Sequence, residues 1–243
     1  MLFGLLFGLA GILSGGIAAV AGFGIGSILT PILALRAGTR LAVAAVAIPH
    51  CLGTAQRFWI LRRHVDRRVL LGFGIASAAG GLAGALAHSA AANRALAIVF
   101  GVVVLLAGVS ELTRWMERVS WGRGAAWVAG ALSGGLGGLV GNQGGIRSAA
   151  MLGFRVPQEA FVATATAVGL FVDAARLPVY LVTEGRAISA LWPLLLTATL
   201  GVVLGTALGT RVLGRLPQRA FRRIVALLLI GLGGYMLLAG GRA

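Results

Sequence analysis

The sequence predicts an all-α polytopic membrane protein made of two inverted repeats, and three observations lead to this fold class. First, 58% of its 243 residues are hydrophobic and only 11% are charged, whereas a soluble domain carries about a quarter charged residues. Second, several runs approach the ~20 apolar residues that a membrane-spanning helix needs. Third, the two halves of the chain match each other at a constant offset. The composition excludes a soluble enzyme, a disulfide scaffold and a disordered tail.

The basic residues of this chain are all arginines, and they give it a net charge of +15. Most of them lie in short gaps between apolar runs, which is where membrane proteins mark their cytoplasmic loops. A nucleic-acid-binding protein would need a basic face on a soluble element, so we expect no nucleic-acid partner. The single cysteine, Cys51, cannot form a disulfide framework or a zinc site. We expect no metal and no cofactor.

Six apolar runs with polar boundaries are predicted to be simple transmembrane helices: 41–61, 69–88, 94–110, 160–182, 188–210 and 220–240. Two further apolar blocks, 2–35 and 125–153, differ because glycines interrupt each of them. The interruptions are Gly22-Phe23-Gly24-Ile25-Gly26 and Gly141-Asn142-Gln143-Gly144-Gly145. Since neither half of a block spans a bilayer comfortably alone, we predict two half-helices in each block, meeting near the midplane. The apolar N-terminus lacks a basic signal-peptide region, so we expect it to belong to the mature fold.

Shifting the chain by 119 residues against itself explains the two blocks. Residues 10–26 then fall on 129–145, with identical residues at eight of these seventeen positions, including a Leu-Ser-Gly-Gly string in each half. The same offset places Arg57 on Arg176. We therefore divide the chain into a first repeat, 1–120, and a second repeat, 121–243, within a single integral membrane domain. Each repeat combines one broken block with three transmembrane helices, an arrangement common in transporters.

Loop charge predicts how the repeats are related. The gap at 62–68 holds four arginines and one aspartate, whereas its counterpart near 183–187 holds one glutamate and one arginine. If basic loops face the cytoplasm, equivalent loops lie on opposite sides of the membrane, so the repeats are inverted. Inversion requires each broken block to enter and leave on one face. This reading makes 62–68, 111–123 and 211–223 cytoplasmic, in a multi-pass protein of the inner (plasma) membrane.

The glycine breaks predict an anion-binding site. Non-helical backbone at membrane depth is tolerated where it is buried in protein or lines a polar cavity. Each break also leaves free N–H groups at the positive end of the following half-helix, and such ends bind anions. The expected substrate-binding residues flank the two breaks: Gly24, Gly26, Ser27, Asn142, Gln143, Gly145, Arg147 and Ser148. For Arg147 the alternative is that it caps backbone carbonyls or reaches the membrane interface. For other glycines (Gly11, Gly15, Gly80 and Gly84) we favour close helix packing.

The glycine pattern also resembles that of a known family. Leu13-Ser14-Gly15-Gly16 leading to the first break, with Pro31 after it, is similar to the signature block of the sulfite exporter TauE/SafE family, and the second half repeats it. The resemblance extends over the whole chain in length, hydropathy and duplication. It implies a permease for small anions, namely sulfite or organosulfonates. Asn142, Gln143 and Arg147 make the second break more polar than is usual in the family, which puts the substrate in doubt more than the fold.

Ionisable residues inside apolar runs suggest proton coupling. Asp173 is the only acid well inside such a run, and Arg176 three residues later shares its helix face, which favours an internal salt bridge. His50 follows Pro49, so it could relay protons or bond a carbonyl that the proline frees. Asp173 and His50 are the proton-coupling candidates, with Arg176 as charge partner. Arg57 lies nearer a helix end and is expected to snorkel to the basic loop.

Together these features predict a permease that moves a small anion by alternating access within the lipid bilayer. A passive anion channel on the same fold and a membrane anchor or assembly subunit without transport remain alternatives. No hydrolase, kinase or metalloprotease motif is present, so we do not expect an enzyme. The sequence leaves transport direction, coupling ion and oligomeric state open, with a homodimer as one option.

Overall fold

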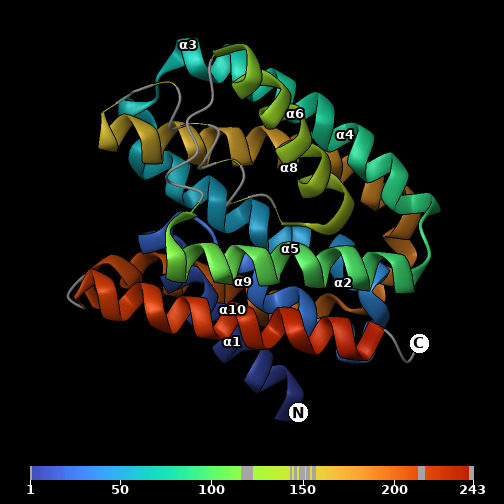
Figure 1. Cartoon of the computed structure of the whole chain (residues 1–243). Coiled ribbons are helices and arrows are strands. Elements are labelled where there is room, and N and C mark those ends of the chain that lie inside the picture. Colours follow the sequence, from blue (N-terminus) through green and yellow to red (C-terminus); the bar gives the residue numbers. More distant parts are fainter. Residues whose placement is uncertain are drawn as a thin grey trace.

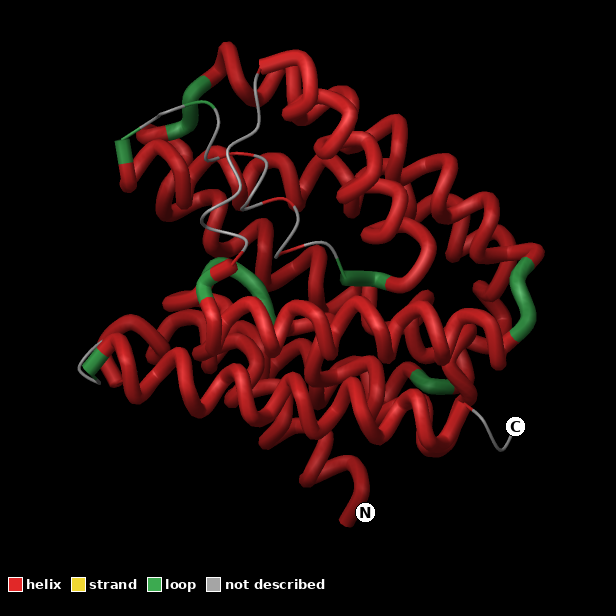
Figure 2. Tube along the Cα trace, in the orientation of Figure 1, coloured by secondary structure: helices red, strands yellow, loops and turns green. Residues whose placement is uncertain are grey.

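The computed structural model describes residues 2–115, 123–142, 144, 147, 151, 154, 157–212 and 217–240, and every element within them is a helix (Figures 1 and 2). The helices of the first half are α1 (Leu2–Ala21), α2 (Ile25–Leu61), η1 (Arg62–His64), α3 (Arg67–Val69), the π-helical turn η2 (Leu70–Gly74), α4 (Ile75–Ala90) and α5 (Asn93–Thr113). Those of the second half are α6 (Arg123–Val140), α8 (Gln158–Ala190), α9 (Trp192–Val212) and α10 (Gln218–Gly240).

Within the described residues, seven helices are long and apolar enough to cross a membrane. They include all six runs predicted as transmembrane helices, with shifted ends. The seventh is α1, whose 20 residues suffice to span a bilayer. The expectation that neither half of the first block could span alone is therefore wrong for α1. The apolar part of α6, Trp127–Val140, is shorter, as expected of a half-helix.

The first broken block folds as a hairpin. α1 ends at Ala21, and α2 begins at Ile25 after a turn in which Gly22 and Gly24 have φ angles of +82° and +133°. At the other end of the hairpin, the Arg36 guanidinium lies 4.2 Å from the centre of the Phe3 ring. The start of α1 and the end of the first segment of α2 are thus neighbours, and the entry and exit of this block on one face of the membrane stays a prediction.

The first segment of α2 ends at Gly38 rather than in a loop. Gly38 has φ 75° and ψ 159°, the only non-helical backbone within the 37 residues of α2. A Cβ atom there would lie 3.3 Å from the Asn93 side chain, which also accepts a hydrogen bond from the Arg40 N–H. The gap expected between residues 35 and 41 is therefore a kink that glycine permits.

A further correction concerns the loop expected near 183–187, which is helical. α8 continues to Ala190 and only then gives way to α9, which begins at Trp192. The physical reason is that Glu184 and Arg186 are compatible with a helix, whereas Pro193 occupies the first turn of α9, where it needs no N–H partner. A hydropathy profile locates polar residues, but it does not show whether they form a loop or the polar end of a helix.

Three helix pairs surround a central pair. α1 packs along α9, α4 along α6, and α5 along α10, while α2 and α8 contact each other between them (Figure 1). At the first two interfaces glycines let the backbones touch. A Cβ at Gly11 or Gly15 would come closer than 3.0 Å to backbone oxygens of α9, and one at Gly80 or Gly84 closer than that to those of α6. The packing role predicted for these four glycines is confirmed.

Candidate functional site

The two glycine breaks contact each other at the centre of the fold. A Cβ atom at Gly26, just after the first break, would lie 2.6 Å from the carbonyl oxygen of Gly141 in the second break. A Cβ at Gly144 would likewise collide with the side chain of Phe23. Gly141 has a φ of +74°, matching the +82° of Gly22. Glycine is therefore needed both for the turns and for their close approach.

The start of α2 faces this contact without a side-chain cap. Gly24 is the N-cap residue and makes no side-chain hydrogen bond to the helix. Ile25, Gly26 and Ser27 form the first turn and are buried. The first N–H groups of a helix have no intrahelical acceptors and lie at its positive end. Gly24, Gly26 and Ser27 are thus placed where the sequence predicted them, at a helix start suited to an anion.

Arg147 joins the two breaks. This helical residue of the second block is only 4% exposed, and its Nη2 atom donates a long hydrogen bond of 3.4 Å to the Gly22 carbonyl in the first break. Its Nη1 atom lies against Gly169 of α8, and the Nε atom has no hydrogen-bond partner. Among the described residues, the guanidinium thus has one long hydrogen bond and an Nε donor without an acceptor.

Asn142 adds another unsatisfied donor at the second break. It is 5% exposed, and its amide nitrogen has no hydrogen-bond partner within the part of the chain that the structure describes. Three other predicted binding residues, Gln143, Gly145 and Ser148, lie outside the described residues. An unsatisfied buried donor costs about 1–3 kcal/mol relative to a paired one. Asn142 thus supplies a buried amide donor at the second break.

Asp173 forms the acidic centre of a buried polar cluster. Its carboxylate lies 2.8 Å from Arg176 Nη2 and 2.7 Å from His50 Nδ1, and none of the aspartate side chain is exposed. The predicted Asp173–Arg176 salt bridge is confirmed. His50 contacts this carboxylate through Nδ1, although the sequence had also allowed a bond to a backbone carbonyl. The two proton-coupling candidates therefore form one hydrogen-bonded pair between α2 and α8.

Arg57 does not snorkel to the basic loop, and that prediction is wrong. The side chain is 6% exposed, its Nε atom donates to Thr166 Oγ1 at 3.2 Å, and Nη1 donates to the Ala18 carbonyl. Arg176 Nη1 makes the equivalent bond to the Gly137 carbonyl at 2.6 Å. Both the two arginines and the two carbonyls are related by the 119-residue offset. That offset was the sequence signal that could have identified Arg57 as a buried, functional candidate.

The cluster carries an excess of positive charge. Among the described residues, the buried members are three arginines (Arg57, Arg147 and Arg176) and one carboxylate, that of Asp173. The charges of Asp173, Arg176 and Arg57 act on His50, and those of Arg57 and Asp173 act on Arg147. With a neutral His50 the net charge is +2. Because buried charge is costly when it is not compensated, a bound anion would stabilise this arrangement.

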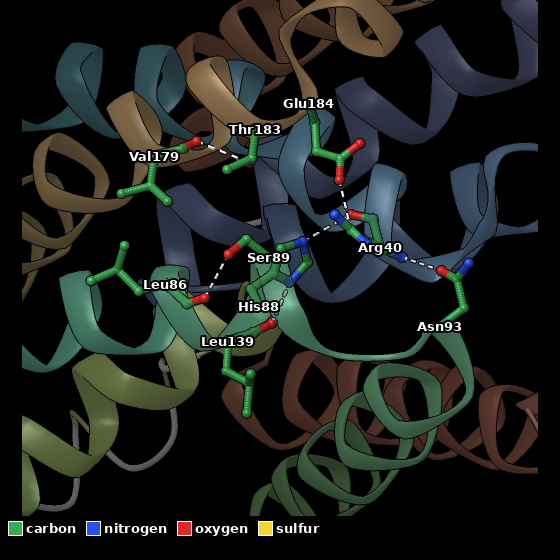
Figure 3. Close-up of polar contacts among 9 residues, drawn as sticks. All are labelled: Arg40, Leu86, His88, Ser89, Asn93, Leu139, Val179, Thr183 and Glu184. Carbon is green, nitrogen blue, oxygen red and sulfur yellow. Dashed lines mark hydrogen bonds and ion pairs between the residues drawn. The ribbon is translucent and has the colours of Figure 1, made fainter.

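A second polar cluster connects α2, α4, α6 and α8 (Figure 3). Arg40 of α2 pairs with Glu184 of α8 at 2.6 Å, and the Arg40 carbonyl lies 3.1 Å from His88 Nε2. His88 Nδ1 lies 2.8 Å from the Leu139 carbonyl at the end of α6. A neutral imidazole can donate to only one of these two carbonyls. This cluster joins elements of both halves of the chain. Within the described residues, no three His, Cys, Asp or Glu side chains group as metal ligands would.

Comparison with known proteins identifies one family. The sequence model of the sulfite exporter TauE/SafE family matches residues 7–236 of the 243. The match covers both glycine breaks and the entire buried cluster. No curated protein and no solved structure matches the chain.

Proposed function

Because the chain belongs to the TauE/SafE family of sulfite exporters, a family of membrane transporters for sulfite or related anions, we propose that it carries sulfite or an organosulfonate by alternating access. The proposed binding site lies between the two glycine breaks. It consists of the first turn of α2 at Gly26 and Ser27, the Asn142 amide and the Arg147 guanidinium. The proposed location is the inner membrane, with the anion exchanged across it.

The observation that carries this proposal is the uncompensated buried charge beside the breaks. Arg147 has one long hydrogen bond and no carboxylate partner among the residues described. The planar guanidinium presents parallel N–H donors that match two oxygens of a sulfite or sulfonate group. Neutral or cationic substrates would leave both the arginine and the helix N-terminus uncompensated. A small oxyanion satisfies both.

Proton coupling is proposed to use the Asp173–His50 pair. The carboxylate also accepts hydrogen bonds from Arg176, so it is held in place between two helices. A proton taken up by His50 adds one positive charge to the cluster, and its release removes that charge. Anion affinity would follow this change, which links proton movement to substrate movement.

The experiment compares uptake of radiolabelled sulfite into proteoliposomes by the wild-type protein and by Arg147→Gln, with and without an imposed pH gradient. Wild-type uptake should saturate and increase with the gradient. The glutamine variant should need roughly 10–100-fold more sulfite for half-maximal uptake, since a charge-assisted hydrogen bond is worth about 1.5–3 kcal/mol. Arg94→Gln provides the matched control, because Arg94 is exposed at the start of α5.

Three results would contradict parts of this proposal. Unchanged half-saturation in Arg147→Gln would remove that arginine from the site. Uptake that follows the anion gradient alone and ignores the pH gradient would indicate a passive channel. No uptake of sulfite, organosulfonates or carboxylates by folded protein would favour a membrane anchor without transport.

A further inference from the structure

A basic hollow lies where α5 ends and α10 begins, away from the buried cluster. It has a volume of about 470 Å³ and is lined by Glu111, Leu112, Arg114, Arg219, Arg222 and Arg223. The two helices run antiparallel here, and the Arg222–Glu111 ion pair, 3.1 Å long, joins them. Four arginines against one glutamate give the lining a net charge of +3. The hollow therefore favours an anionic ligand.

An apolar groove continues from this hollow along α10. It has a volume of about 520 Å³ and shares Arg219 and Arg223 with the basic hollow, while Ala220, Ile224 and Leu227 complete its lining. Ile224 is 55% exposed and Leu227 is 60% exposed. Charged and apolar surfaces thus follow each other along one helix. A ligand that matches both has an anionic head and a hydrocarbon tail.

Positive charge is concentrated at the start of α10. α10 has no acidic residue in its first turn, although acidic residues are the ones that complement the positive end of a helix. Arg219, Arg222 and Arg223 instead add positive charge beside that end. The αL residue Arg114, with φ 58°, terminates α5 next to them. An anion between the helices would complement this positive charge.

We propose that this hollow and groove form a binding site for an anionic phospholipid. The headgroup phosphate is bound by Arg219 and Arg223, and one acyl chain runs along Ile224 and Leu227. The predicted topology places 111–123 and 211–223 in the cytoplasm, where the leaflet carries anionic lipids that attract basic side chains. The rule that basic loops face the cytoplasm requires only that these loops be positively charged. It does not require arginines to lie together beside an apolar groove. This site is independent of the proposed anion transport.

The test measures lipid binding by native mass spectrometry of the purified protein in a non-ionic detergent. Phosphatidylglycerol and phosphatidylcholine with identical chains are titrated separately, and so is inorganic phosphate. We expect the wild type to retain phosphatidylglycerol in preference to phosphatidylcholine. Arg219→Gln combined with Arg223→Gln should weaken phosphatidylglycerol binding roughly 30-fold, because each arginine near an anionic headgroup contributes several-fold.

The matched control replaces two exposed arginines elsewhere, Arg94 and Arg186, by glutamine and so removes the same charge. It should bind phosphatidylglycerol like the wild type. If the Arg219/Arg223 variant does not fold, Leu227→Asn tests the tail groove and should also weaken binding. The proposal would be overturned if phosphatidylcholine bound as tightly as phosphatidylglycerol. It would also be overturned if both double variants lost the same amount of affinity for phosphatidylglycerol. If inorganic phosphate binds as tightly as the lipid, the site takes a soluble anion and the proposal is overturned. If the wild type is a dimer and the Arg219/Arg223 variant is a monomer, this surface binds a second copy of the chain, and the proposal is overturned as well.

Discussion

Asp173 contacts two partners that differ in their capacity to exchange a proton. Arg176 is permanently charged and is fixed by its additional bond to the Gly137 carbonyl. His50 lies on the other helix, with a side chain that is 15% exposed. Imidazole changes charge near neutral pH, whereas guanidinium does not. Arg176 thus positions the carboxylate, and His50 is the proposed proton carrier.

Replacing His50 by Gln should separate proton coupling from anion binding. Glutamine can still donate a hydrogen bond to Asp173 but cannot take up a proton. We expect stimulation of sulfite uptake by a pH gradient to disappear, while sulfite counterflow without a gradient stays within about threefold of wild type, since no donor of the proposed binding site is removed. Both rates are measured in the same proteoliposomes.

The control for this variant is His64→Gln, which changes an exposed histidine in η1. It should retain full stimulation by the gradient. Retained stimulation in His50→Gln would exclude His50 as the proton carrier. Loss of both activities would instead mean that His50 is needed to build the cluster.

At the scale of elements, glycine faces hold the helix pairs together. Gly80 and Gly84 of α4 lie against the backbone of α6, and Gly134 and Gly138 of α6 lie against that of α4. This reciprocal contact brings the helix axes close, as in small-residue motifs of membrane helices. Since lipid supplies no hydrophobic driving force between helices, this packing must come from close van der Waals contact. The half-helices that carry the breaks are positioned in this way.

Gly84→Ala should therefore destabilise the fold. The added Cβ would lie closer than 3.0 Å to the Gly135 carbonyl, so the helices must separate. We expect a loss of about 1–3 kcal/mol, as for overpacking in a core, and a lower thermal unfolding midpoint in detergent.

The comparison variant is Gly231→Ala in α10, where nothing lies within 4 Å of a new Cβ. Alanine has the higher helix propensity by about 1 kcal/mol, so this substitution should leave stability unchanged or raise it. We therefore expect Gly84→Ala to lower the unfolding midpoint and Gly231→Ala to leave it unchanged or raise it. Equal effects would mean that the α4–α6 contact is looser than described.

The whole molecule pairs helices across its two halves. α1 packs with α9 while α6 packs with α4, and α5–α10 and α2–α8 are pairs of repeat-equivalent elements. The hydrogen bonds from Arg57 to the Ala18 carbonyl and from Arg176 to the Gly137 carbonyl are related in the same way, because equivalent residues of the two repeats make them. A two-fold relation between the predicted repeats, 1–120 and 121–243, would generate this pattern. The inversion itself is still a prediction, because it concerns the side of the membrane.

Single-cysteine labelling tests the inversion. In a Cys51→Ala background, cysteines replace Arg63, Ser189 or Arg219 in turn, all of them exposed. A membrane-impermeant maleimide should label position 189 in intact spheroplasts, but positions 63 and 219 only after permeabilisation. Basic loops face the cytoplasm because they resist translocation.

The background protein without cysteine should not label under either condition. Labelling of positions 63 and 189 from the same side would contradict the inverted arrangement. Labelling of position 63 but not 189 in intact spheroplasts would retain the inversion and reverse the orientation.

Local sequence was sufficient to predict much of this fold. The apolar runs, the breaks at Gly22–Gly26 and Gly141–Gly145, and the packing role of Gly84 follow from hydropathy and from the conformational range of glycine, which are properties of short segments. The Asp173–Arg176 pair was predictable for the same reason, since both residues lie on one helix turn. Where prediction failed, at 183–187, the sequence was compatible with both loop and helix.

Contacts between distant residues were decided only by the tertiary structure. The sequence by itself determined that Arg57, His50 and Arg147 occur in apolar surroundings, but His50 and Asp173 are 123 residues apart and come from different helices. Their meeting depends on the rotation and depth of each helix, which are set by its packing against several neighbouring helices. For this reason Arg57 was expected at the basic loop and lies instead in the cluster, bonded to the Ala18 carbonyl of α1. The sequence determined which charges enter the membrane, and packing determined which of them face one another.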